Sequence, residues 1–440
     1  MLVNNPLTSI YLSQQVRELD RIATEDKGIP GIKLMLRAAQ TCVDILSQSL
    51  QPPVKVSVLC GSGNNAGDGF IIAGLLANRG IEVTVGLVGK LPSSETDAGK
   101  AYEYCRAANV KIHSAELSLQ DSTFVVDALL GTGLNGDVRS EYKQVISAVN
   151  LQQCTVLSVD IPSGLCANTG NIMGACIKAD MTVTFIGLKL GLLTNNGPEV
   201  VGKLNFSDLS VSSDVFDTIE PCVRMLSYED EVRKMPVRNK NSHKTKHGHV
   251  LIVGGDQGMA GAVVMSAEAA MYSGAGLVSV ATHPTSVTPL VSRRPEVMVN
   301  GVTTADELEM LINRATVIVV GPGFGGESAW SSELFNVVLK SKLPLVIDAD
   351  GLNLLSRLPS KPQRRDNWIL TPHPGEARNL LQKNVQIDRL ASVKQLHEKY
   401  GGICLIKGAG TLIARNNDVR LCPYGNPGMS VAGMGDILSG

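Results

Sequence analysis

Short β-branched runs alternate with helical segments along most of the chain, and this alternation limits the fold more than any other feature of the sequence. The first clear strand covers residues 54–60, and further strands are predicted at 81–88, 123–130 and 154–161. The same rhythm restarts with a strand at 249–255. Such alternation predicts parallel sheets covered by helices on both faces, so we expect an α/β fold.

A polar and charged stretch from Leu209 to Asn241 interrupts the alternation. The 440 residues are enough for more than one domain, since a domain takes roughly 150 residues. We therefore predict two different α/β domains, at residues 1–215 and 241–440, joined by a linker at 216–240.

Charge and cysteine content exclude several classes of protein. The chain carries 40 basic and 41 acidic side chains, a balance that argues against nucleic-acid and membrane-surface partners. Its 9 cysteines are scattered and form no CxxC pair, which argues against a disulfide framework and favours a reducing compartment. No stretch approaches the roughly 18 apolar residues of a membrane span. We expect a cytoplasmic, homo-oligomeric protein with small-molecule ligands.

The loop GSGNNAGDG at 61–69 lies between a predicted strand and a helix. Gly61, Gly63 and Ala66 match the GxGxxG/A dinucleotide fingerprint and indicate a Rossmann-like domain. An oxidoreductase of that type also needs an acidic residue at the end of the second strand, but this strand ends in GLVGK and Glu82 lies at its beginning. The fingerprint is half met, and the lesser alternative is that Asn64 and Asn65 serve only a left-handed turn.

Two further loops, DALLGTGLNGD at 127–137 and VDIPSGL at 159–165, also follow predicted strands. Loops at the carboxyl ends of parallel strands meet at one edge of the sheet, where ligands of open α/β folds bind. Oxygens of Asn65, Asp127 and Ser163 could hold a hard monovalent cation there. An aspartate such as Asp160, held over a ligand, can transfer protons.

These three loops, in the form GSGNNAGDG, VDALLGTGLNGD and SVDIPSGLCANTGN, resemble the epimerase domain of NAD(P)H-hydrate repair enzymes over about residues 10–215. The resemblance implies interconversion of the R and S hydrates of NADH and NADPH at the nicotinamide C6, with Asp160 as the proton-transferring residue. It implies potassium ligands at Asn65, Asp127 and Ser163. It implies hydrate-binding positions at Asn64, Asn65, Ala66, Gly67, Asp68, Gly131, Thr132, Gly133, Leu134, Asn135, Gly136, Asp137 and Asp160. Ala66 replaces a usual glycine, and we expect the loop to tolerate it unless this position needs a positive φ.

The second half ends in NPGMSVAGMGD at 426–436. Backbone N–H groups of Gly433 and Gly435 could stabilise a transferred phosphoryl group while Asp436 takes a proton from the attacking hydroxyl. A simple helix cap by Asp436 is the alternative. No GxxxxGK[ST] sequence occurs in the chain, which excludes a Walker-type site. The remaining pattern resembles the ribokinase-like superfamily.

Within that superfamily, MAGAVVMSAEAAMYSGAGLV, GPGFG, DADGLNLL, TPHPGEA and the 426–440 segment are similar to the ADP-dependent NAD(P)H-hydrate dehydratase, from about residue 240 onward. The resemblance implies dehydration of the S hydrate to NAD(P)H, AMP and phosphate, with magnesium on the nucleotide and Asp436 as base. It implies hydrate contacts at Ala262, Gly323, His373 and Asp436. It implies nucleotide contacts at Lys407, Gly408, Ala409, Gly410, Thr411 and Gly435.

The chain ends shortly after Asp436, whereas dehydratases of this family continue through further helices. We expect a C-terminally incomplete second domain, a frayed DILSG terminus and weak or absent dehydration. Two other functions remain open. One is a ribokinase-like small-molecule kinase with a Rossmann-like binding domain, and the other is a non-catalytic nucleotide-binding or scaffold protein.

Overall fold

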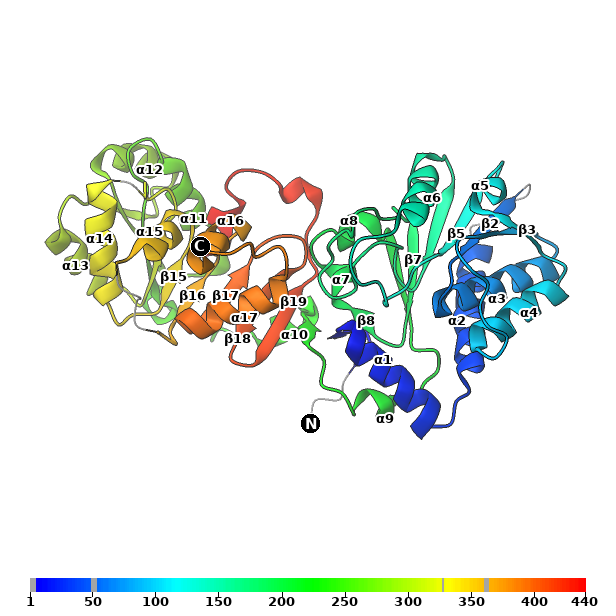
Figure 1. Ribbon diagram of the computed structural model, residues 1–440. Helices are drawn as coiled ribbons and strands as arrows, with labels where there is room; N and C mark the ends of the chain where they lie inside the picture. Colours follow the sequence, from blue (N-terminus) through cyan, green and yellow to red (C-terminus); the bar gives the residue numbers. More distant parts are fainter. Residues whose placement is uncertain (1–4, 49–53, 327, 360–363) are drawn as a thin grey trace. The chain divides into compact units, whose positions relative to one another are not determined.

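The computed structural model describes residues 5–48, 54–326, 328–359 and 364–440. The chain divides into two compact units, Met1–Met225 and Leu226–Gly440. Each unit is an α/β structure with its own sheet (Figure 1).

The first unit is built on a sheet of seven parallel strands among its described residues. The strand order is β4 (Lys111–Ser114), β3 (Glu82–Leu87), β2 (Lys55–Cys60), β5 (Phe124–Ala128), β6 (Thr155–Val159), β7 (Met181–Phe185) and β9 (Lys203–Ser207). The order reverses between β2 and β5, and this switch point is where open α/β sheets bind ligands.

Helices cover both faces of this sheet (Figure 1). They are α1 (Ser13–Arg21), α2 (Gly31–Ser47), α3 (Asn64–Asn78), α4 (Asp97–Ala107), α5 (Ala115–Ser118), α6 (Ser140–Leu151), α7 (Leu190–Leu193), α8 (Gly197–Val200) and α9 (Ser213–Phe216). A π-helical turn, Ile22–Asp26, continues α1. Three short strands pair beside the main sheet, with β1 (Ser9–Tyr11) between β8 (Leu188–Lys189) and β10 (Val223–Met225).

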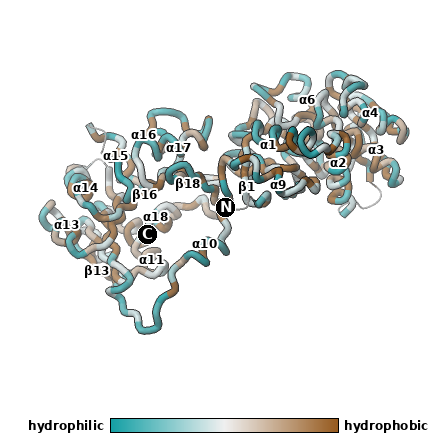
Figure 2. Tube along the Cα trace, turned by 90° about the horizontal axis from the view of Figure 1, so that it is seen from below, coloured by the Kyte–Doolittle hydropathy of each residue, from teal (hydrophilic) through white to brown (hydrophobic). Residues whose placement is uncertain are grey.

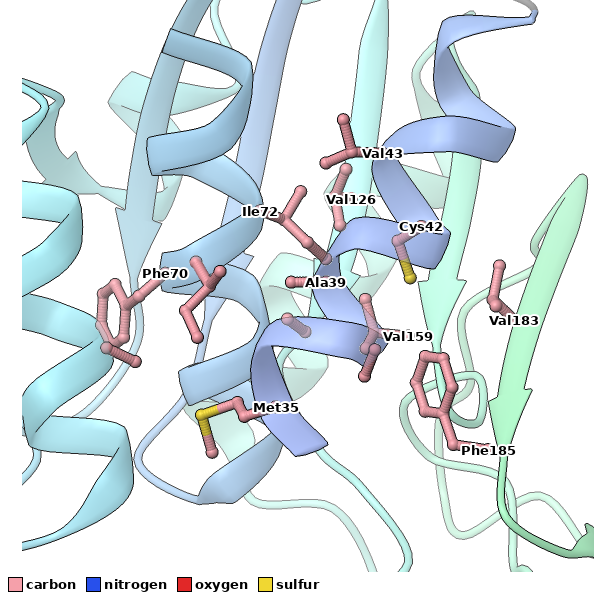
Figure 3. Packing of buried hydrophobic residues seen from close by; sticks show 14 of the residues in the cluster. Met35, Ala39, Cys42, Val43, Phe70, Ile72, Val126, Val159, Val183 and Phe185 are labelled. Atoms are coloured by element: carbon pink, nitrogen blue, oxygen red, sulfur yellow. The ribbon is translucent and has the colours of Figure 1, made fainter. Parts of the chain in front are cut away.

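Alternate residues of the central strands pack into different cores because successive side chains of a strand point to opposite faces. Val126 of β5 packs with α2 and α3, whereas Val125 beside it packs with α6. Figure 3 shows the first of these cores, in which Ala39 and Val43 of α2 lie next to Ile72 of α3 and Val126 of β5. A fully buried valine contributes about 1.5–3 kcal/mol relative to an exposed one. The sheet is therefore held from both sides.

The second unit has a sheet of nine strands among its described residues. Their order is β13 (Met298–Gly301), β12 (Leu277–Thr282), β11 (His249–Val253), β14 (Val317–Val320), β15 (Leu345–Ile347), β16 (Trp368–Leu370), β17 (Ile403–Ile406), β18 (Thr411–Arg415) and β19 (Asp418–Cys422). The first seven are parallel, and β17, β18 and β19 pair antiparallel.

The helices of the second unit flank this sheet. They are α10 (Tyr228–Lys234), α11 (Ala260–Ser273), α12 (Val287–Arg293), α13 (Ala305–Ile312), α14 (Ala329–Lys340), α15 (Ala349–Arg357), α16 (Pro374–Leu381), α17 (Arg389–Tyr400) and α18 (Met434–Ser439). Short 3-10 helices cover Lys244–His247, Pro284–Ser286 and Pro427–Met429.

The predicted alternation of strands and helices is confirmed, and the observed strands are shorter than expected by up to two residues at an end. The expected linker at 216–240 contains β10 and the whole of α10. The polar segment that follows α10 is exposed and is drawn mostly teal in Figure 2, in line with its charged sequence.

Gly69 of α3 lies against the sheet, and a methyl group there would lie 2.7 Å from Ala128 Cβ and 2.8 Å from Cys60 Sγ. We expect Gly69→Ala to destabilise the first unit by about 1–3 kcal/mol because the packed sheet cannot move away. Calorimetric unfolding of the full chain checks this. Gly261→Ala in α11, where no heavy atom lies within 4 Å of the new methyl, is the matched control and should gain up to about 1 kcal/mol. A stabilised Gly69→Ala variant would contradict the packing described here.

Candidate functional site

A cavity of about 870 Å³ opens at the switch point of the first sheet. Its walls come from the loops after β2, β5 and β6, as the sequence predicts, and also from α1, α2 and β8. Ten of the expected hydrate-binding residues line it: Asn64, Asn65, Asp68, Gly131, Thr132, Gly133, Leu134, Asn135, Asp137 and Asp160.

Asn64 to Asp68 belong to the first turns of α3 and do not form a loop, because the loop after β2 is limited to 61–63. Helical spacing turns Asn65 and Asp68 toward the cavity, while Ala66 and Gly67 face the packed interior. Ala66 has no positive φ, so its methyl causes no backbone strain. Ala66, Gly67 and the loop residue Gly136 are expected hydrate contacts that do not line the cavity.

The carboxyl group of Asp127 is fully buried beneath the cavity and accepts hydrogen bonds from two loops. The Leu129 and Ser163 N–H groups donate to it at 3.3 and 2.8 Å, and the hydroxyls of Ser158 and Ser163 donate as well. Burial raises the pKa of Asp127, and these hydrogen bonds partly oppose the increase. The network joins the loops after β5 and β6.

The expected potassium ligands lie around the carbonyl of Leu130. The amide of Asn65 donates to this carbonyl at 3.3 Å, and Ser163 Oγ lies 3.2 Å from it and next to Asp127. Carboxylate, hydroxyl and carbonyl oxygens therefore meet at one point, and such hard oxygens suit an alkali cation. Asn65 would turn its amide oxygen inward to join them. The donor set fits the ion.

Asp160 follows β6 with φ +67°, a left-handed conformation that non-glycine residues seldom adopt. Its Oδ1 is paired with the ammonium of Lys189, a side chain that is only 1% exposed. Lys189 also donates to the Thr184 hydroxyl at 2.9 Å and the Phe185 carbonyl at 3.1 Å. Asp160 itself is 19% exposed at the cavity wall. The left-handed backbone and the ion pair with the buried Lys189 thus orient the carboxylate.

Sequence reasoning missed Lys189 and Asp20, which also line the cavity. Burial raises the pKa of Asp20 to about 6, with Lys189 lowering it and Asp160 raising it. Burial also raises the pKa of Asp68 well above its usual range, with further increases from Asp160 and Asp20 and a decrease from Lys189. No local motif marks Lys189 or Asp20, because they reach the cavity from β8 and α1.

The second unit brings Lys407 and Gly435 together around Asp348 of the DADGLNLL motif. Asp348 is 1% exposed, and its Oδ1 accepts from Lys407 Nζ at 2.7 Å. A methyl on Gly435 would lie 3.4 Å from that nitrogen and 3.5 Å from Asp348 Oδ2. Within the described chain, this buried Oδ2 has no hydrogen-bond partner. Asp348 was not among the expected site residues.

Asp436 and His373 lie near this pair, as their electrostatics indicate. Burial and the charge of Asp348 raise the pKa of Asp436, which Lys407 opposes. Burial and Lys407 lower the pKa of His373. His373 caps α16 by accepting from the Gly375 N–H at 2.9 Å. Glu376, bonded back to the His373 N–H at 2.8 Å, has its pKa raised by burial to about 7.

The remaining expected residues lie on adjoining loops. Gly323, with φ +54°, is so close to α11 that a methyl on it would lie 3.0 Å from Ala262 Cβ. The neighbouring Gly325 N–H donates to Asp350 at 2.9 Å, which ties this loop to the Asp348 segment.

The side chain of Arg389 holds the backbone of the expected nucleotide-binding segment, which consists of Lys407, Gly408, Ala409, Gly410 and Thr411. This side chain is 2% exposed and donates to the carbonyls of Ile406, Lys407 and Ala409 at 2.7–3.3 Å.

The expected fraying of the DILSG terminus is wrong, because α18 covers Met434–Ser439 and packs on α11. The Ser266 hydroxyl donates to the Asp436 carbonyl at 2.8 Å and lies 3.2 Å from the Ser439 hydroxyl. Tertiary contacts supply the stability that a six-residue helix lacks on its own.

Fold and site together define a two-part α/β enzyme, with a Rossmann-like unit followed by a ribokinase-like unit. A protein-family model described as YjeF-related protein N-terminus matches residues 31–191. A second family model, described as NAD(P)H-hydrate dehydratase, matches residues 250–440. The chain is 44% identical over 439 residues to a bifunctional NAD(P)H-hydrate repair enzyme of Coxiella burnetii, covering 99% of this chain and 89% of the relative. It is 39% identical to that of Escherichia coli, covering 99% and 85%. The chain belongs to the family of bifunctional NAD(P)H-hydrate repair enzymes.

Among solved structures, a ribokinase-like superfamily protein from Enterococcus faecalis is similar, with 31% identity and a TM-score of 0.46 over 49% of this chain and 77% of that chain. An ADP/ATP-dependent NAD(P)H-hydrate dehydratase from Bacillus subtilis, crystallised with ATP and Mg²⁺, has 26% identity and a TM-score of 0.43 over 49% of this chain and 78% of that chain.

The interaction between Lys407 and Asp348 can be measured through the free energy of unfolding. We expect Lys407→Met to destabilise the second unit by about 3 kcal/mol because it leaves a buried carboxylate unpaired. The double variant Lys407→Met/Asp348→Asn should recover most of this loss. Calorimetry of the four proteins in the cycle measures the coupling. The control Lys100→Met removes an exposed pair with Asp97 and should change stability by less than about 1 kcal/mol. Additive single effects would show that the two groups do not interact.

Proposed function

We propose that this chain repairs hydrated nicotinamide cofactors through two activities, one in each unit. The first interconverts the R and S hydrates of NADH and NADPH, and the second dehydrates the S hydrate with ADP as co-substrate. We assign the epimerase to residues 1–215, the dehydratase to 241–440 and a linker to 216–240. The observation that carries the proposal is the Asp160 carboxylate, which Lys189 holds at the wall of the large cavity.

The first unit would bind the hydrate along Asn64–Asp68 and Gly131–Asp137, with Asp160 as the proton-transferring residue. Support comes from the cavity, which these segments line with both polar side chains and backbone. The helix N-terminus at Asn64 also favours the anionic pyrophosphate of the cofactor.

Potassium would be held by Asn65, Asp127 and Ser163, with the Leu130 carbonyl as a further oxygen. A bound cation would supply positive charge at the point where the loops after β5 and β6 meet.

In the second unit, Asp436 would take the proton from the hydroxyl of the hydrated carbon. That oxygen then attacks the terminal phosphorus of ADP and AMP leaves, after which phosphate departs and a ring proton is lost to give NAD(P)H. Backbone N–H groups of Gly433 and Gly435 stabilise the transferred phosphoryl group. Ala262, Gly323 and His373 would contact the hydrate. Lys407, Gly408, Ala409, Gly410, Thr411 and Gly435 would contact the nucleotide.

Magnesium on the nucleotide phosphates would neutralise their charge during transfer. Asp348, Asp350 and Asp436 offer carboxylate oxygens for it, and the unpartnered Oδ2 of Asp348 fits a hard cation.

None of the helices within the described ranges is long and apolar enough to cross a membrane. The cytoplasmic location and the homo-oligomeric state remain predictions from the sequence.

Two matched variants test the division of labour. We expect Asp160→Asn to lower epimerisation by roughly 10²–10⁴-fold and to leave the dehydration of pure S hydrate unchanged, because the two bases act in different units. Asp436→Asn should have the converse effect. Chromatography of the two epimers and NADH absorbance follow the two reactions separately. A phosphorylated product that accumulates from ATP would favour the small-molecule kinase, and two variants without effect on chemistry would favour a binding protein.

The cation site predicts a specific ion dependence. Replacing potassium by lithium should slow epimerisation and lower the Tm of the first unit, since a ligand that binds only the folded state stabilises it. Ser163→Ala should raise the potassium concentration needed for both effects by about tenfold, or ~1.4 kcal/mol in binding. Ser158→Ala is the control, because Ser158 also donates to Asp127 but is not a proposed ligand. Equal responses of the two variants would argue against the assigned ligands.

A further inference from the structure

The cavity of the first unit contains more titratable groups than a single base requires. Asp20, Asp68, Asp160 and Lys189 all line it, and they come from α1, α3, the loop after β6 and β8. The proposed epimerase uses only Asp160 for proton transfer. The other three groups therefore need an explanation.

Lys189 has no N–H left for a ligand. An ammonium has three donors, and those of Lys189 meet the Asp160 carboxylate, the Thr184 hydroxyl and the Phe185 carbonyl. The Thr184 hydroxyl and the Phe185 N–H also approach Asp160 Oδ1, at 3.3 and 3.4 Å. The Lys189 ammonium, the Thr184 hydroxyl and the Phe185 N–H thus converge on one carboxylate oxygen and hold Asp160 in place.

Asp68 lies on the first turn of α3 and shares the cavity wall with Asp160. The charged or titratable groups around it are Asp160, Asp20, Lys189, Cys42 and Cys60. Burial and two neighbouring carboxylates keep the pKa of Asp68 well above its usual range. Asp68 thus retains a proton at pH values where an exposed aspartate has lost it, and it can donate.

Inversion at the hydrated carbon requires both a base and an acid. The carbon carries a hydroxyl and is bonded to the ring nitrogen. When a base takes the hydroxyl proton, an aldehyde C=O forms, the C–N bond breaks, and its electron pair goes to nitrogen, which takes a proton from an acid. Rotation and the reverse steps close the ring with the other configuration and return both protons.

We propose that Asp68 is the acid that works opposite Asp160 in this reaction and that Lys189 is the residue that positions Asp160. This rests on the proposed epimerase function. Asp160 gains the hydroxyl proton while Asp68 gives its proton to nitrogen, so the reaction consumes no external reagent.

The test compares Asp68→Asn with the wild-type full-length chain. The new amide has the size and neutrality of a protonated aspartate but does not act as an acid, so the fold should be kept. We expect kcat for epimerisation to fall by roughly 10²-fold or more, with KM within a few-fold of wild type. The wild-type rate should fall as pH rises through the Asp68 pKa, because only the protonated form donates. The variant should lose this decline.

Lys189 is tested by Lys189→Met and Lys189→Arg. We expect the first to lower kcat and to alter the pH profile, and the second to restore part of the rate because it keeps a cation beside Asp160. The thermal transition of the first unit reports whether each variant has folded, and dehydration by the second unit should be unchanged. The control Asp44→Asn removes an exposed carboxylate of α2 that pairs with Arg79 at 3.0 Å, and it should leave epimerisation unchanged.

The outcomes are distinguishable. A wild-type chain that does not epimerise would overturn the proposed function itself. If the wild type is active, the present proposal is overturned when Asp68→Asn keeps the wild-type kcat and the wild-type decline of the rate at high pH. A rise in KM alone, with an unchanged pH profile, would make Asp68 a binding residue and would overturn the proposal equally.

Discussion

The fully buried carboxyl group of Asp127 is the interaction on which the first site depends. Its hydrogen bonds to Ser158, Ser163 and Leu129 join two loops that would otherwise leave the sheet independently. Ser163 Oγ also accepts from the Leu130 N–H at 2.8 Å, and the Leu130 carbonyl accepts from Asn65 at the start of α3, so the network extends to that helix. Buried hydrogen bonds therefore connect the segments that form the walls of the cavity. Hydrogen bonds in such a buried network strengthen one another, and an unpaired buried polar group is costly, so the network is most stable when every member is bonded.

The sequence predicted the parts of the site that follow strands. The Asp127, Asp160 and Asn65 segments could be assigned to one edge because parallel strands end on the same side, and β2, β5 and β6 are indeed neighbours. Lys189, Asp20 and Asp348 could not be assigned in this way, since what places them is tertiary packing rather than a local motif. The start of α3 at Asn64 was also missed, because asparagine and glycine favour turns as readily as a helix N-terminus. Helix α18 forms through its contacts with α11, which propensity alone does not anticipate.

The two units share one electrostatic feature, a buried or half-buried ion pair between a lysine and an aspartate. Each carries a lysine paired with an aspartate at the carboxyl end of a parallel strand, Lys189 with Asp160 and Lys407 with Asp348. In each case a residue at the turn has a positive φ, Asp160 itself in one unit and Ala349 in the other. The second aspartate keeps one oxygen without a hydrogen-bond partner in the described chain.

The left-handed backbone of Asp160 restricts which mutations this position can accept. Glycine, asparagine and aspartate occupy that conformation with little cost, whereas β-branched and bulky residues do not. Of these three, only aspartate carries a carboxylate that can pair with Lys189 and move a proton. Glutamate would keep the charge but would have to adopt an unfavourable backbone and extend one carbon further. Backbone geometry and chemistry thus favour the same residue on separate grounds, so a descendant of this enzyme that replaced Asp160 by anything other than glycine or asparagine would have to rebuild the turn as well as the reaction.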